Sequence, residues 1–311
     1  MAAGRASPAG TAARRNSPLS GAGADMAVML SREAFLLLLA GGILAGQTRG
    51  RRTPAASKMK TLGLIGGTSW HSTVEYYQYI NQAVNDLYGD NTNPPLILYN
   101  LNQQHIHALQ SQDRWDEIAS ILADAVIRLH GAGAEAALFC ANTPHKVYAQ
   151  VLRKTGVPIL HIGDATGRAI RRAGLTKVGL IGTIYTMQDS FLRDWLHDRY
   201  GIEVVVPPSQ DARNELQRII QKELGMGIFK PQTKDYVLQQ MAALRSQGAQ
   251  GIVLGCTEFP LIIHQADVSY PVFDTTRLHA GMAVDFILGR DEGGPQAGPH
   301  ESPTAARSVL E

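Results

Sequence analysis

Residues 251–260 read GIVLGCTEFP, a short apolar run that is followed at once by Cys256, Thr257 and Glu258. An apolar run of this length between glycines is typical of a buried strand. Ligands of an open α/β sheet bind beyond the carboxyl ends of its strands, which is where this thiol would lie. Cys256 is therefore the first candidate for chemistry.

A second stretch repeats this pattern earlier in the chain. Residues 136–145 read AALFCANTPH, again an apolar strand that ends in a thiol, small polar residues and a turn. Two similar strand ends suggest two similar halves that face one cleft.

The composition is that of an ordinary globular protein. The chain has 311 residues, of which 44% are apolar and 18% charged, enough for one large or two medium α/β domains. Its formal charge is +2, but residues 1–58 alone carry +6, which leaves the remainder near −4. A mildly acidic chain with scattered basic residues argues against a nucleic-acid partner. Two cysteines are too few for a disulfide framework, so we expect free thiols and a cytoplasmic location.

The two ends of the chain look different from its middle. Residues 1–58 are predicted to be a disordered or targeting extension, and residues 289–311 a disordered tail. Residues 34–46 form an apolar run that is too short to span a bilayer but has the length of the hydrophobic part of an export signal. Export through residues 26–46 is therefore the alternative location, and no membrane association is expected unless that segment is a real signal.

From Met59 onward, predicted strands alternate with predicted helices, which favours a parallel sheet in each half. We predict an α/β fold with halves at 59–164 and 165–277, and a last helix at 278–288 that packs back on the first half. Residues 60–70, KTLGLIGGTSW, predict the first strand and a glycine-rich turn. Ser72 and Thr73, with Glu75, are predicted to cap the helix that follows. The turn could hold an anion, but it lacks the spacing of a nucleotide-binding loop.

Four motifs occur in the order in which the aspartate/glutamate racemase family has them, and over residues 59–288 the chain resembles that family. The motifs are LIGGTSW at 64–70, NTPHK at 142–146, GCTE at 255–258 and FDTTRLH at 273–279. The resemblance implies two halves related by a pseudo-two-fold axis, an active site between them and a small amino-acid substrate. It also implies a homodimer and no cofactor. His105, His107 and His161 lack carboxylate or thiol companions at ligand spacing, so no metal site is expected.

The family's reaction explains why two strand ends matter. The Cα proton of an amino acid is a very weak acid, so inversion without pyridoxal phosphate needs one group to remove it and another on the opposite face to return a proton. A cysteine suits this work because its pKa lies near working pH. Here Cys256 fills one of the two positions. The other position, directly before Asn-Thr at 142–143, is occupied by Ala141, which can transfer no proton. Cys140 comes one residue early, so we expect its thiol to enter the core.

Three interpretations follow from the missing acid. In the first, the protein is a racemase in which Cys256 serves one face and His145, Cys140 or water serves the other. Alternatively, the site is a one-base catalyst of the decarboxylase or isomerase kind, or a noncatalytic binder of small carboxylates. His145 could instead orient its loop, and Glu258 could either raise the basicity around the thiol or cap the next helix. Asp274 and Thr275 are expected to begin the last helix as a cap.

The resemblance also implies substrate contacts, of which Asn142, Thr143 and Thr257 would hold the α-carboxylate. The full set is Gly67, Thr68, Gln110, Asn142, Thr143, Thr183, Thr186, Thr257 and Glu258. Some family members hold a second carboxylate with a lysine for which the matching position here is near Gly225. The sequence therefore leaves the substrate side chain open.

Overall fold

A computed structural model describes residues 59–290, so the predicted extension, its apolar run at 34–46 and most of the predicted tail lie outside the described residues. Within residues 59–290, no helix combines the length and the apolar character needed to cross a membrane.

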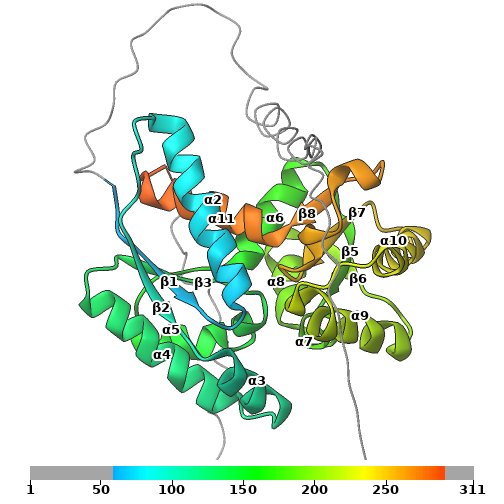
Figure 1. The fold of residues 1–311 in the computed structure, drawn as a ribbon, viewed down its shortest axis with the longest axis horizontal. Helices are drawn as coiled ribbons and strands as arrows, with labels where there is room; N and C mark the ends of the chain where they lie inside the picture. The colour runs from blue at the N-terminus through cyan, green and yellow to red at the C-terminus, as the bar shows by residue number, and fades with distance from the viewer. Residues whose placement is uncertain (1–58, 291–311) are drawn as a thin grey trace, which may run out of the picture. The chain divides into compact units, whose positions relative to one another are not determined.

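Two four-stranded sheets, parallel throughout, form the frame (Figure 1). The first sheet has the order β2-β1-β3-β4 and the second β6-β5-β7-β8. Each sheet thus places its second strand outside its first, and its fourth outside its third. The prediction of two similar parallel α/β halves is confirmed. The strands are β1 (Leu62–Gly66), β2 (Leu96–Asn100), β3 (Ala136–Phe139), β4 (Ile159–Leu160), β5 (Lys177–Gly182), β6 (Glu203–Val205), β7 (Gly251–Gly255) and β8 (Val272–Asp274).

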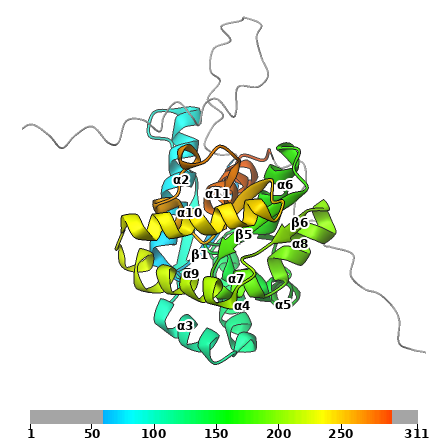
Figure 2. The same ribbon diagram turned by 90° about the vertical axis from the view of Figure 1, so that its right-hand side faces the viewer.

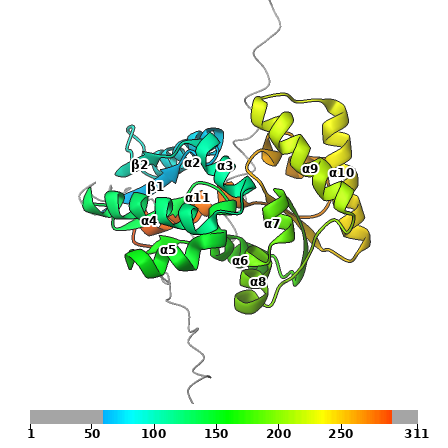
Figure 3. The same cartoon turned by 90° about the horizontal axis from the view of Figure 1, so that it is seen from below.

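Helices cover both faces of the first sheet. On one face α3 (Gln103–Ser111), α4 (Trp115–Gly131) and α5 (Tyr148–Thr155) bury Ile106, Leu122 and Val151 with Phe139 of β3. Figure 3 shows α4 and α5 beside each other on this side. On the other face α2 (Trp70–Tyr88) buries Tyr76 and Ile80 against Leu64 of β1 and Leu138 of β3. The central strands β1 and β3 are therefore buried on both sides, as in a parallel sheet covered by helices.

The second sheet is covered in the same way. The helices α7 (Ile184–Gln188), α9 (Gln210–Lys222) and α10 (Pro231–Ser246) pack on the face that carries Ile181, Ile252 and Leu254. Figure 2 shows α9 and α10 in front of β5. The helices α6 (Ile162–Arg172) and α8 (Phe191–Tyr200) cover the opposite face, where Leu180 and Val253 lie. Short 3-10 turns at Thr143–Val147, Leu224–Met226, Phe259–Leu261 and Gln265–Asp267 complete the connections.

The last helix, α11 (Thr275–Ile287), leaves the second sheet and packs against α2 of the first half. Its Ala283 and Ile287 lie in one cluster with Tyr76 and Ile80 of α2. The Asp274 carboxylate accepts hydrogen bonds from two backbone N–H groups of the first turn, so the predicted cap is confirmed. The helix begins earlier than the predicted residue 278, because that cap stands directly at the end of β8.

The prediction for the start of α2 is wrong. The helix begins at Trp70, and its N-cap is Ser69, whose side chain accepts from the Ser72 N–H at 3.5 Å. The chain can turn this early because Gly67 has φ +82°, and a Cβ there would lie 2.1 Å from the Leu101 carbonyl oxygen. Ser72 and Thr73 therefore lie inside the first turn, with buried side chains.

Candidate active site

The Glu258 carboxylate lies at the centre of a hydrogen-bonded group at the end of β7. It accepts from Cys256 Sγ at 2.8 Å and from Thr257 Oγ1 at 2.9 Å, both through Oε2. Ser69 Oγ donates to its other oxygen, Oε1, at 3.0 Å. The Glu258 side chain makes no capping bond to the 3-10 turn that follows, so its contact with the thiol is the better supported of its two expected roles.

Ser72 extends this group into the first half. Its hydroxyl contacts Thr257 Oγ1, and both residues are buried. A threonine hydroxyl has one proton to give, and Thr257 gives it to Glu258. Ser72 is therefore the donor in its bond to Thr257, which makes a directed chain from Ser72 through Thr257 to Glu258.

The Cys256 thiol is protonated at neutral pH. Cys256 is 6% exposed, and its burial raises the pKa of the thiol well above the ordinary value. The negative charge of Glu258 raises that pKa further. The sulfur therefore donates to Glu258, and its thiolate, once formed, is a stronger base than a free cysteine.

The strand registers relate the two halves to each other. The glycine-rich ends of β1 and β5, residues 65–66 and 181–182, have the same Ile-Gly sequence. Phe139 of β3 lies opposite the first isoleucine, and Leu254 of β7 lies opposite the second. Phe139 and Leu254 are therefore equivalent positions.

Two residues beyond these positions, Ala141 occupies the place that Cys256 has in the second half. Cys140 corresponds to Gly255, one residue too early to share the Cys256 position. The Cys140 thiol is buried in the cluster that also contains Leu64, and burial raises its pKa. The prediction that this thiol enters the core is confirmed.

The His145 ring is fully engaged with the backbone. Its Nε2 accepts from the Ile162 N–H at 3.2 Å, so its proton is on Nδ1, which lies 3.1 Å from the carbonyl oxygens of both Ala141 and Asn142. Burial lowers the pKa of His145 to about 4. This geometry favours the loop-orienting role over an acid role, because neither ring nitrogen is free to exchange a proton with a ligand.

Polar side chains also connect the ends of β3, β5 and β8. Asn142 Nδ2 donates to Thr275 Oγ1 at 3.0 Å, while its Oδ1 is buried without a hydrogen-bond partner in the described chain. Thr143 and Thr183 are joined through their hydroxyls at 3.2 Å, and Thr183 and Thr186 at 2.9 Å. The loops of the two halves thus meet at several points.

Three residues expected to contact the substrate do not join the hydrogen-bonded groups described above. The Gly67 N–H donates to Thr73 Oγ1 at 3.0 Å, so it is already used within the turn. Thr68 Oγ1 is buried without a partner in the described chain. Gln110 lies near the end of α3, and within residues 59–290 no hydrogen bond joins it to the strand-end side chains.

Sequence reasoning missed Ser69 and Ser72 as members of this site. Their spacing of three residues at a helix start places them on one helical face, which is the only signal that could have indicated them. Their partners lie more than 180 residues away in the chain, at sequence separations of 189 and 185.

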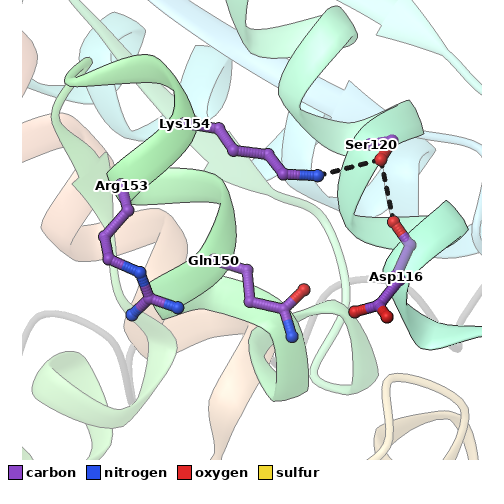
Figure 4. A pocket seen from close by; sticks show the side chains of 5 residues that line it. All are labelled: Asp116, Ser120, Gln150, Arg153 and Lys154. Atoms are coloured by element: carbon purple, nitrogen blue, oxygen red, sulfur yellow. Dashed lines mark hydrogen bonds between the residues drawn. The ribbon is translucent and has the colours of Figure 1, made fainter.

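A pocket of about 370 Å³ lies elsewhere, between α4 and α5 (Figure 4). Lys154 Nζ donates to Ser120 Oγ there at 2.9 Å, and Ser120 donates to the Asp116 carbonyl oxygen at 2.8 Å. Gln150 and Arg153 complete the lining, which includes none of the predicted site residues. Within the described residues, no group of three His, Cys, Asp or Glu side chains is arranged as metal ligands.

Paired α/β sheets with a thiol and a carboxylate at one strand end define a two-lobed protein whose site is built from strand-end loops. Residues 65–283 match the Asp/Glu/Hydantoin racemase family, and the chain belongs to that family.

Known relatives match this chain over nearly their whole length. The chain is 24% identical over 231 residues to the broad specificity amino-acid racemase RacX of Bacillus subtilis, covering 73% of this chain and 98% of the relative. A Yersinia pestis structure, provisionally an Asp/Glu racemase, is 43% identical with a TM-score of 0.70, covering 74% of this chain and 100% of that one. An aspartate racemase homologue from Pyrococcus horikoshii OT3 is 38% identical with a TM-score of 0.65, covering 74% and 99%.

Proposed function

We propose that the protein is an amino-acid racemase that moves the Cα proton without a cofactor, with Cys256 as its acid/base group. Family membership supports the reaction class. The observation that carries the assignment is the Cys256 sulfur at the end of β7, in contact with Glu258 at 2.8 Å.

In this mechanism the Cys256 thiol first loses its proton to solvent, and the resulting thiolate then takes the Cα proton and forms a new S–H bond. The electron pair of the broken C–H bond stays on Cα and spreads into the α-carboxylate. The neighbouring charge of Glu258 makes the thiolate a stronger base, which the weakly acidic Cα proton requires. Cys256 later releases its proton to solvent.

On the opposite face of Cα, water has to supply the proton. Ala141 carries no proton to give, the Cys140 thiol lies in the core, and both nitrogens of His145 are engaged. A water molecule on the Ala141 side protonates Cα, and the hydroxide that remains is neutralised by the proton from Cys256. We expect slow turnover, because water is a much weaker acid than a positioned thiol.

The unpaired groups suggest how the substrate is held. Asn142 presents a buried amide oxygen without a partner, which fits the α-ammonium group better than the α-carboxylate expected from the sequence. The hydroxyls of Thr68 and Thr143 then remain for the carboxylate. Thr183 lies beside Thr143, and Thr186 beside Thr183. Since Cys256 is 6% exposed, the substrate can reach it only when the loops of the two halves separate.

The test is exchange of the Cα proton in D₂O, measured by mass spectrometry and chiral chromatography on L- and D-amino acids. Both enantiomers should exchange and interconvert, and Cys256→Ala should abolish this. Cys140→Ala is the matched control, because it removes the other thiol of a chain that has only two. If no amino acid exchanged its Cα proton, the remaining interpretation would be a noncatalytic binder of small carboxylates.

Ala141 supports a second candidate, a one-base catalyst. Such an enzyme would exchange the proton of one enantiomer and retain its configuration. The same experiment separates it from a racemase. Assembly as a homodimer in the cytoplasm stays a prediction.

A further inference from the structure

The hydrogen-bond donors that surround Glu258 come from both halves of the protein. Cys256 and Thr257 follow β7, whereas Ser69 and Ser72 belong to the start of α2. Glu258 is buried, so the position and charge of its carboxylate depend on these donors.

Ser69 determines which oxygen faces the sulfur. It occupies Oε1 of Glu258, and this leaves Oε2 to accept from Cys256 and Thr257. Ser72 acts one step further away, because its donation to Thr257 strengthens the bond from Thr257 to the carboxylate. Each donor also draws part of the negative charge of Glu258 away from the thiol.

We propose that Ser69 and Ser72 are positioning residues for Cys256: through Glu258 and Thr257 they fix the carboxylate and share its negative charge, so that the thiol releases its proton more readily when the two halves are joined. The catalytic role of the thiol proton rests on the proposed function, but the hydrogen bonds around Glu258 do not depend on that function. A separated second half would keep Cys256 and Glu258 but lose both serines, and the unshielded carboxylate would then hold the thiol in its protonated form.

Other ionisable groups face Glu258 in the described chain. Glu75 lies one turn beyond Ser72 on α2, and burial, with the charges of Asp274 and Glu258, raises the pKa of Glu75 to about 7. From α3, His107 interacts with the charge of Glu258, although burial lowers the pKa of His107 overall. Both groups stay unchanged in the variants below, so they contribute equally to each titration.

The experiment titrates the Cys256 thiol directly, through the ultraviolet absorbance of the thiolate. A Cys140→Ala background leaves Cys256 as the single thiol, and the variant that also carries Cys256→Ala supplies the tyrosine baseline. Ser72→Ala removes the remote donor. Ser69→Gly removes the direct donor and costs a helix cap only a few tenths of a kcal/mol relative to serine. Absorbance reports ionisation without any reagent having to reach the sulfur.

Two control variants separate positioning from general damage. Ser209→Gly removes the same kind of N-cap, at the start of α9. Glu258→Gln removes the charge through which both serines are proposed to act. Amino-acid turnover is not needed for the readout, so failure of the proposed function would not affect it.

In Ser72→Ala and Ser69→Gly, a given thiolate fraction should be reached about 0.5 to 1 pH unit higher, which is about three- to tenfold less thiolate at a fixed pH below the midpoint. Ser209→Gly should leave the titration in place. In a Glu258→Gln background, the serine substitutions should have no further effect. Titrations that coincide with that of Ser209→Gly, or a serine effect that persists without the Glu258 charge, would overturn the proposal.

Discussion

Ala141 lacks only the sulfur that Cys256 carries at the matching position of the other half. The registers of the two sheets establish this equivalence without reference to any relative. A side chain of one methyl group cannot exchange a proton, so the chemistry of the site is unequal on its two sides.

Ala141→Cys should therefore restore the missing group. The new thiol would face the site from the end of β3, and we expect racemisation to rise by about tenfold or more, in the range that positioned acid–base catalysis contributes. Chiral chromatography of the products measures the rate. Ala141→Ser is the matched control, because it adds an atom of similar reach with a far weaker acid. Equal rates in the two variants would contradict the assigned position.

Glu75 predicts how stability depends on pH. Its pKa is about 7 in the folded protein and near 4.5 in the unfolded chain, because burial and the charges of Asp274 and Glu258 disfavour its ionised form. Below pH 4.5 the carboxyl is neutral in both states. As the pH rises through the window from 4.5 to about 7, the unfolded state ionises first and the folded protein loses stability.

Glu75→Gln should remove that loss. At about pH 8 we expect the variant to be more stable than the wild type by about 1 to 2 kcal/mol, less than the full shift implies because the side chain is partly exposed. At about pH 4 the two proteins should have equal stability. Urea unfolding at both pH values measures this, with exposed Asp86→Asn on the same helix as the control. A difference that is constant with pH would show that packing, not ionisation, is responsible.

At this scale the sequence predicts Cys256, Thr257 and Glu258, but not Ser69 and Ser72, which contact Glu258 and Thr257 from the first half. The position of the thiol follows from an apolar strand and its end, which are local features. The contact of Ser72 with Thr257 depends on how two segments meet that are 185 residues apart, and no local pattern contains that information. For the same reason the local pattern predicts only a helix cap at Ser72.

Among the helices and strands, α11 matters most because it joins the two halves. It follows β8 of the second sheet, yet Phe286 and Ile287 lie in the core of the first half with Leu62 and Tyr76. Its existence could be predicted from apolar spacing. Its cap at Asp274 could also be predicted, but the apolar spacing starts only at Leu278, because the residues at 275–277 carry no apolar side chain.

Phe286→Ala should therefore weaken both halves. Phe286 is buried, with Lys60 Nζ 4.8 Å from its ring centroid, and its truncation should cost about 3 to 4 kcal/mol. Hydrogen exchange of the β1 and β7 amides, followed by mass spectrometry, should show equal losses of protection in the two sheets. Leu261→Ala, at an exposed position, is the control. A loss confined to β1 would show that the halves unfold separately.

At the scale of the molecule, the repeated strand order explains why the fold was predictable. Each half is a run of apolar strands and amphipathic helices, and parallel pairing leaves few topologies for such a run. The contacts between the halves were much less predictable. They depend on short polar side chains such as Thr143 and Thr183, whose sequence pattern does not differ from that of ordinary turns.

The unequal strand ends at Ala141 and Cys256 have one further consequence, for kinetics. Mirror-image amino acids have identical free energies in water, so the equilibrium constant of their interconversion is unity whatever the catalyst. For the proposed racemase, the ratio kcat/KM must then be the same for the L and the D form, even though the Cα proton of one form would face a thiolate and that of the other would face water. The asymmetry of the chain can appear only as proportional differences in kcat and KM: the form with the higher kcat must also have the higher KM, by the same factor.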